Sequence, residues 1–188
     1  MPTRTTPAAD ARPPRERILD TAHDLFYREG IRATGIDRVI AEAGVSKVTF
    51  YRQFPSKDEL VLAFLDFRHA RWMAWFADAL ARHGGTVAAL VPALREWLAS
   101  PDYRGCAFIN SVGELGPVLP QVVELARSHK QDMTAAVAAL LRPARGRAAA
   151  ARAIALAIDG AIVQAQYLES PEAALEPLGL VLAALAPG

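Results

Sequence analysis

The hydrophobic positions near the N-terminus recur at the spacing of amphipathic helices. A first apolar stripe predicts a helix over residues 15–29, and Gly30 supplies the permissive backbone that ends it. The stripe consists of Ile18, Ala22, Leu25 and Phe26. Such a helix can cover the apolar faces of the segments that follow.

A second stripe predicts another helix before Gly44. Thr34 and Asp37 stand at the spacing of a capping box, in which the hydroxyl accepts from a first-turn N–H group and the carboxylate reaches back. We therefore expect the helix to begin at Thr34 and to end at Gly44. Its apolar residues are Ile36, Val39, Ile40 and Ala43.

A short third helix follows the glycine turn. Ser46 is a candidate N-cap, and Pro55 disfavours helical geometry at the residue before it, so the helix can run only to about Phe54. At about 100° per residue, Phe50 and Phe54 share one face. The outer face is then small, hydroxylated and basic, with Val48, Thr49, Tyr51 and Arg52.

A long fourth helix is predicted over residues 57–82, before the break at 83–85. Ser56 and Glu59 repeat the capping-box spacing at its start. Lys57 lies in its first turn, where a cation is disfavoured by the helix dipole unless an anion such as a phosphate is near. At about 1.5 Å per residue the helix spans about 39 Å, which is enough to link two domains.

The remaining pattern is also helical, so the predicted fold class is all-α. Pro92 is expected to kink the fifth helix, and Gly160 allows close helix approach in a segment that carries few charges. Helices are expected over residues 86–100, 106–114, 117–141 and 148–168, and in a last segment after Pro171.

Composition limits the kinds of protein that this chain can be. Its 188 residues are 52% hydrophobic and 22% charged, with a net charge of +1. No apolar run reaches the roughly 18 to 20 residues of a membrane span, and no signal-peptide pattern is present, so a cytoplasmic location is expected. The single cysteine, Cys106, excludes an intrachain disulfide and is interpreted as a small buried hydrophobe rather than a redox sensor.

Catalytic and metal-binding patterns are weak. Two Asp-x-x-His pairs, Asp20 with His23 and Asp66 with His69, fall in different predicted domains and lack further acidic ligands, so surface pairing is the favoured interpretation. There is no phosphate loop, nucleophile elbow or zinc signature. We expect no enzyme activity, no metal and no cofactor.

The stretch from residue 30 to residue 57 has a more specific meaning. A helix, a glycine turn and a short helix with an exposed mixed face are typical of the helix-turn-helix that enters the DNA major groove. The sequence over roughly 14–62 closely resembles the DNA-binding domain of the TetR family of transcriptional regulators. The resemblance rests on Gly30, Thr34, Ala43-Gly44-Val45-Ser46, Thr49, Tyr51-Arg52, Phe54 and Lys57.

Residues 1–14 are rich in proline, carry two arginines and show no periodicity, so they are expected to form a flexible basic arm. The resemblance implies a helix-turn-helix DNA-binding domain over 15–56 and a ligand-binding and dimerisation domain over 57–188. The protein would be a repressor that binds a palindromic operator in double-stranded DNA as a homodimer and is released by a small-molecule inducer. Val48 stands where the family often has Gly, and Gln53 where it often has His. The operator sequence therefore does not follow from the family.

The resemblance and side-chain chemistry together assign candidate DNA contacts. Phosphate contacts are expected from Thr34, Ser46, Tyr51 and Lys57, and base-edge contacts from Lys47, Val48, Thr49 and Arg52. The role of the arm stays open: Arg4 and Arg12 can reach DNA, or the arm has no role.

Two further sites are expected in the C-terminal half. Aromatic bulk with a few polar tips, typical of ligand pockets, points to Trp72, Trp75, Trp97, Tyr103, Cys106, Phe108, Asn110, Met133, Gln164 and Tyr167. The family resemblance assigns the dimer interface to the last two helices, with Ile154, Ile158, Gly160, Ile162, Leu175, Leu178 and Leu182.

Each of these residues can instead be ordinary core. A rival hypothesis is an all-α small-molecule-binding or scaffolding protein that does not read DNA.

Overall fold

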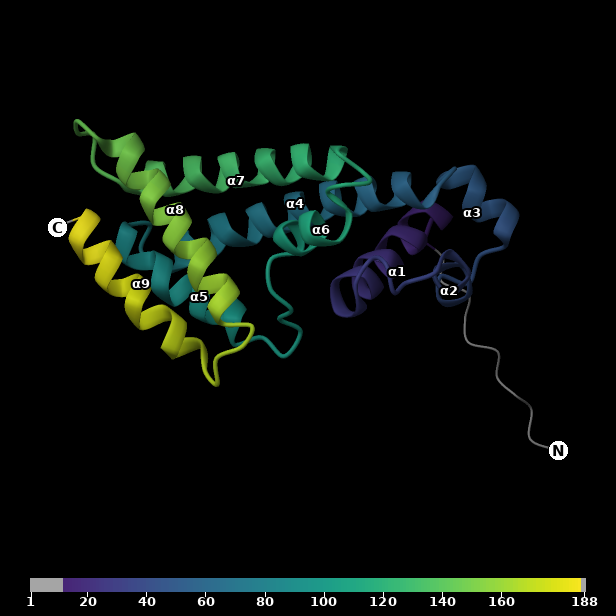
Figure 1. Cartoon of the computed structure of the whole chain (residues 1–188), viewed down its shortest axis with the longest axis horizontal. Helices are drawn as coiled ribbons and strands as arrows, with labels where there is room; N and C mark the ends of the chain where they lie inside the picture. The colour runs from purple at the N-terminus through teal and green to yellow at the C-terminus, as the bar shows by residue number, and fades with distance from the viewer. Residues whose placement is uncertain (1–11, 187–188) are drawn as a thin grey trace. The chain divides into compact units, whose positions relative to one another are not determined.

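The computed structural model describes residues 12–186, which form nine α-helices and one 3-10 turn, without a strand (Figure 1). The predicted all-α fold is confirmed. These residues make two compact units, which divide between Phe64 and Leu65 within the long helix α4 (Lys57–Arg82). No helix in the described part of the chain combines the length and the apolarity that crossing a membrane requires.

The first unit consists of α1 (Pro14–Glu29), α2 (Ile36–Glu42), α3 (Lys47–Gln53) and the start of α4. The helix α1 packs against both α2 and α3, as its apolar stripe predicts. The rings of Phe26 and Phe64 meet edge to face with centroids 5.5 Å apart. The core of this unit includes Ile18, Leu25, Phe26, Val39, Phe50, Leu60 and Phe64, all buried.

The predicted capping box at Thr34 is wrong. The helix α2 begins at Ile36 with Gly35 as its N-cap, and the Thr34 side chain is fully buried. Its hydroxyl donates a hydrogen bond to the carbonyl of Gly30 (2.8 Å). The last carbonyl groups of a helix receive no N–H donor from within the helix, and the Thr34 hydroxyl supplies a donor for the Gly30 carbonyl at the end of α1. The residue therefore ties the end of α1 to the start of α2.

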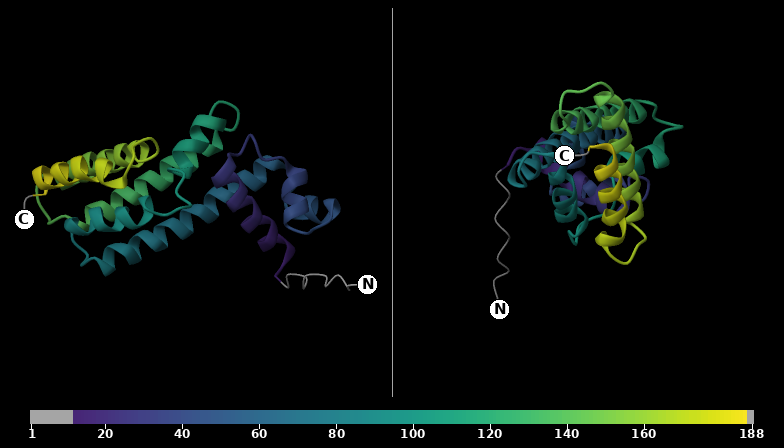
Figure 2. Two further views of the ribbon diagram at one scale, coloured as in Figure 1. Left: turned by 90° about the horizontal axis from the view of Figure 1, so that it is seen from below. Right: turned by 90° about the vertical axis from the view of Figure 1, so that its left-hand side faces the viewer.

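The second unit is a bundle in which α6 packs on α7, α7 on α8, α8 on α9, and α5 on α9. Both views in Figure 2 show α8 and α9 side by side. Its elements after α4 are the 3-10 turn η1 (Val87–Ala89), α5 (Leu90–Leu98), α6 (Ala107–Leu115), α7 (Gln121–Leu140), α8 (Arg147–Gln164) and α9 (Pro171–Leu185).

The predicted kink at Pro92 is also wrong. The helix α5 begins only at Leu90, after η1, so Pro92 lies in its first turn. Backbone N–H groups in a first turn have no partner within the helix, and a proline there removes no hydrogen bond.

The residues expected at a dimer interface mostly face the inside of the second unit. Gly160 is half-buried, and the other six are buried, with exposed fractions of 6% or less. These six are Ile154, Ile158, Ile162, Leu175, Leu178 and Leu182. Both α8 and α9 are apolar on two faces, and the prediction chose the face that packs against the chain's own core. The opposite face carries Leu156 and Leu180, each 75% exposed.

Two N-cap serines allow a matched test of local stability. Ser46 accepts a hydrogen bond from the backbone N–H of Thr49 (3.1 Å), whereas Ser170, the N-cap of α9, makes no such bond. Ser46→Ala should lower the free energy of unfolding by about 1 kcal/mol, and Ser170→Ala should change it by less than about 0.5 kcal/mol. Urea unfolding followed by circular dichroism measures both, and equal losses would contradict the assignment of the cap.

Candidate functional site

The helix α3 presents a mixed outer face over a buried aromatic inner face. Phe50 and Phe54 are buried, whereas Val48 is 70% exposed and Tyr51 40% exposed. Lys47 and Arg52 are exposed as well, and Thr49 is half-buried. The predicted division of this helix into inner and outer faces is confirmed.

The turn before α3 is held by its backbone and by one distant side chain. Gly44 adopts φ +62°, a conformation that side chains with a Cβ rarely take, and this glycine brings the chain round to Ser46. Arg17 in α1 donates to the carbonyls of Ala43 (3.2 Å) and Gly44 (3.4 Å). Sequence reasoning missed Arg17, because no local pattern links it to a turn 26 residues away.

Lys57 has a protein partner at the start of α4. Its Nζ donates to the carbonyl of Ile31 at 2.6 Å, which joins α4 to the segment between α1 and α2. The sequence predicts a phosphate as the partner of this first-turn cation. The carbonyl satisfies one of the three donors of the ammonium group and leaves its charge in place.

The basic residues of this unit differ in how far they are neutralised. Arg38 hydrogen-bonds to Glu29 (2.9 Å) and to Glu42 (2.8 Å), and its hydrogen bond holds the pKa of Glu29 below the usual value. Lys47 Nζ lies 3.6 Å from an Asp37 carboxylate oxygen, and both side chains are exposed. No hydrogen bond or ion pair joins Arg52 to another residue within 12–186. Arg52 therefore presents an unpaired charge on the outer face of α3.

The predicted N-terminal arm is described only at its end. Arg12 forms an ion pair with Asp20 of α1, and Arg4 lies outside the described residues.

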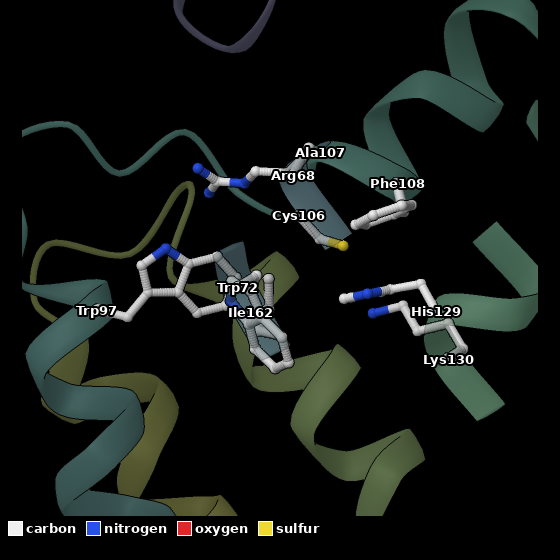
Figure 3. Close-up of a pocket in the computed structure, with 9 residues that line it drawn as sticks. All are labelled: Arg68, Trp72, Trp97, Cys106, Ala107, Phe108, His129, Lys130 and Ile162. Carbon is white, nitrogen blue, oxygen red and sulfur yellow. The ribbon is translucent and has the colours of Figure 1, made fainter. Parts of the chain in front are cut away.

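A second cluster lies inside the second unit, around a small cavity (Figure 3). Trp72 stacks on Phe76 with ring centroids 4.6 Å apart, and Trp97 meets Trp72 edge to face at 5.5 Å. Across the cavity from these rings, Phe108 stacks on His129, with ring centroids 3.8 Å apart and an angle of 11° between the ring planes. The cavity is lined by Arg68, Trp72, Trp97, Cys106, Ala107, Phe108, His129, Lys130 and Ile162.

The cavity is very small in this structure. Its volume is about 10 Å³, enough for about one water molecule. The indole N–H of Trp72 is buried beside it and has no hydrogen-bond partner in the described structure. Buried polar groups in proteins are almost always paired, so this donor can serve an acceptor that enters the cavity.

The charged groups at the cavity are basic. Lys130 Nζ lies 2.5 Å from a carboxylate oxygen of Asp159 on α8, which holds it in place. Burial, and then the charges of Lys130, His69 and Arg68, lower the pKa of His129 to about 3. His129 is therefore neutral at pH 7, and its Nδ1 shares a hydrogen bond with Nδ1 of His69 (3.1 Å).

The structure brings together only part of the predicted ligand set. Trp72, Trp97, Cys106 and Phe108 line the cavity, and the prediction that Cys106 is buried is confirmed. Tyr103 packs edge to face on Trp97 and donates to the carbonyl of Ile162, whereas Trp75 packs against Trp72 and Trp97 from outside the lining.

Four predicted ligand residues lie elsewhere. Gln164, the last residue of α8, and Tyr167, in the turn after it, are exposed and do not line the cavity. Met133 is core, and Asn110 donates to the carbonyl of Arg104. The lining residues that the sequence missed include Arg68, His129 and Lys130, which are polar residues within otherwise ordinary helical stripes.

The neutral, buried state of His129 predicts a pH dependence. Its pKa of about 3 lies below the unfolded value of about 6.5, so the unfolded chain takes up an extra proton between these values. Stability from this group is complete above pH 6.5 and is lost as the pH falls, by up to about 1.4 kcal/mol per pH unit. Urea unfolding of wild type and His129→Phe between pH 7 and 4.5 should show a shallower slope in the variant, and equal slopes would contradict a buried neutral imidazole.

Comparison with known proteins agrees with the geometry of both units. Residues 18–64 match the family model described as bacterial regulatory proteins, tetR family. A curated HTH-type transcriptional regulator from Lactococcus lactis is 28% identical over 106 residues, which are 54% of this chain and 54% of that protein. The chain thus spans about half the length of this relative.

Solved structures extend the similarity over nearly the whole chain. SCO4454, a TetR-family transcriptional regulator from Streptomyces coelicolor, is 35% identical with a TM-score of 0.80, covering 92% of this chain and 93% of that one. The tetr-transcriptional regulator sav143 from Streptomyces avermitilis is 30% identical with a TM-score of 0.76, covering 93% and 98%. Members of this family regulate transcription and are not enzymes. This chain belongs to the TetR family of transcriptional regulators.

Proposed function

We propose that the protein is a ligand-responsive repressor that binds a palindromic DNA operator as a homodimer and leaves it when a small molecule enters the second unit. The observation that carries this proposal is the outer face of α3, where Lys47, Val48 and Arg52 are exposed above a buried aromatic face. A short, capped helix of this kind after a glycine turn suits insertion into a major groove.

The exposed residues divide by the kind of DNA group that each can contact. Arg52 and Lys47 can donate to acceptors on guanine, and Val48 can contact a thymine methyl group. Ser46, Tyr51 and Lys57 remain candidates for phosphates, where they would fix the position of the helix. Thr34 leaves this set because its hydroxyl is buried and bonded to Gly30.

Dimerisation is proposed through the exposed side of α8 and α9. On α8 the apolar residues of that side recur at spacings of three and four, as in paired helices. The same spacing holds on α9, where Leu180 is central. The exposed or half-buried residues of this surface, here called the α8–α9 stripe, are Ala153, Leu156, Gly160 and Val163 on α8, Tyr167 in the turn after it, and Ala173, Pro177, Leu180 and Ala184 on α9.

Ligand control is proposed through the aromatic cavity. Its stacked rings, two nearby cations and the unpaired Trp72 N–H combine apolar surface with a few polar groups, as ligand sites do. At about 10 Å³ the cavity must expand to admit a ligand, so binding and a rearrangement of the surrounding helices would occur together. The helix α4 carries both Trp72 and Lys57, which gives such a rearrangement a direct route to the DNA-binding unit.

Selection of bound DNA from a random pool tests the function as a whole. We expect an enriched palindrome whose half-sites lie about one helical turn, or about 34 to 36 Å, apart or a multiple of it. The winning DNA then serves in a gel-shift screen for small molecules that release it. An all-α scaffold without DNA readout would enrich no sequence.

Two variants separate a DNA contact from a structural role. Lys57→Ala should weaken binding to all sequences alike and lower the slope of log K against log salt by about one, because one phosphate contact is lost. Thr34→Val should leave that slope unchanged and reduce only stability. Both are measured on the selected operator by fluorescence anisotropy at several salt concentrations. An unchanged slope for Lys57→Ala would remove Lys57 from the phosphate contacts.

The dimer surface has its own matched pair of variants. Leu156→Glu places a charge in the α8–α9 stripe and should convert dimers to monomers in sedimentation velocity, because a buried unpaired charge is costly. Val118→Glu changes a residue that is 66% exposed but outside the stripe, and it should leave the dimer intact. If both variants remain dimeric, the interface lies elsewhere.

A further inference from the structure

We propose that the second unit binds an amphiphile with an anionic head and an aliphatic chain, in an open groove distinct from the aromatic cavity. The groove has a volume of about 680 Å³, within the range of small-molecule sites. Three segments far apart in the sequence form it: residues 86–88, residues 140–150 and the end of α9. Figures 1 and 2 show these segments gathered at the end of the bundle where α9 finishes.

The apolar part of the groove is aliphatic. Leucines from two helices and a valine from η1 line it together with alanines, and no aromatic ring does. Flat ligands usually find aromatic partners in their sites, whereas a flexible alkyl chain gains from burying CH₂ groups against aliphatic side chains. The apolar lining residues are Val87, Ala88, Leu140, Leu141, Ala144, Ala150, Leu185 and Ala186.

The charged part of the groove is entirely basic. Arg142, Arg145 and Arg147 line it, and no aspartate or glutamate does. Arg147 is fixed by the hydrogen bond from its Nε to the carbonyl of Ala138 (2.7 Å). Arg142 and Arg145 are exposed and have no hydrogen bond or ion pair with any residue in the described part of the chain.

Several other arginines of the same unit are paired with acids, although Arg152 of α8 has no ion pair within the described residues. Arg82, Arg95 and Arg127 each contact a carboxylate of a glutamate or an aspartate. Arg142, Arg145 and Arg147 lie beside an aliphatic surface with no acid in the groove, so an anionic ligand can bind to them. Guanidinium groups bind carboxylates through paired hydrogen bonds, so a carboxylate head fits the arginines while its chain fits the leucines.

Titration of the full-length protein with sodium decanoate tests the proposal by isothermal calorimetry. We expect saturable binding with one decanoate per chain. Decanamide, which has the same chain and no charge, should bind about tenfold more weakly or worse. Decyltrimethylammonium should not bind the groove, because its charge repels the arginines. Equal binding of decanoate and decanamide, or no saturable binding of decanoate, would overturn the proposal.

Matched variants locate the site. The double variant Arg142→Gln/Arg145→Gln should weaken decanoate binding by about tenfold, as expected for two lost exposed charge contacts. Arg127→Gln/Arg152→Gln removes the same charge from α7 and α8 outside the groove and should leave binding unchanged. Leu185→Asp should weaken binding by putting a negative charge beside the chain.

Two results would assign the groove or the ligand differently. Wild-type affinity in the Arg142→Gln/Arg145→Gln variant would place decanoate elsewhere, for example in the aromatic cavity, and would overturn the proposal. Loss of self-association in that variant, measured by sedimentation without decanoate, together with unchanged decanoate binding, would make the groove a contact between copies of the chain. Binding to operator DNA plays no part in either measurement, so the proposal stands or falls apart from the function proposed above.

Discussion

The burial of Phe50 and Phe54 is the constraint on which the DNA-binding unit depends. Phe50 lies in a helix of only seven residues and Phe54 is its C-cap, so their burial fixes the rotation of the helix about its own axis. The opposite side then has to carry Val48 and Arg52 outward. An isolated helix of this length is unstable in water, because nucleation is unfavourable and few hydrogen bonds follow. The helix α3 is therefore stabilised by its surroundings. These are the packing of its aromatic side, the Ser46 cap and the Gly44 turn.

The sequence predicts this unit well because its signals are local. Ser46 caps a helix three residues before the donor it serves, and Gly44 takes the left-handed conformation that the turn requires. Thr34 shows where local reasoning fails. A threonine before an aspartate at capping distance fits a helix start, but a free carbonyl at Gly30 competes for the same hydroxyl. Only the three-dimensional path of the chain determines whether the Thr34 hydroxyl accepts from an N–H group of α2 or donates to the carbonyl of Gly30.

The second unit is predictable in its helices and much less so in its surfaces. Periodicity identifies apolar stripes on α8 and α9, but a helix that is apolar on two sides offers no local signal for which side faces the core. Ile162 illustrates the ambiguity, since it was expected at a dimer interface and lies beside Trp72 at the cavity. His129 and Lys130 escaped prediction for a related reason. The role of a polar residue in a helix depends on its neighbours on other helices, here His69 for His129 and Asp159 for Lys130.

Local pairing explains how a chain with a net charge of only +1 can still attract anions. Part of its charge is cancelled within a few ångströms, as where Arg38 meets Glu29 and Glu42. Interactions between exposed charges fade beyond about 8 to 10 Å at physiological salt, so a partner senses the nearby pairs rather than the sum over the chain. Arg52 on α3 and the pair Arg142 and Arg145 are among the described cations that have no ion pair. The location of unpaired cations, more than their number, therefore determines where this protein can hold an anion.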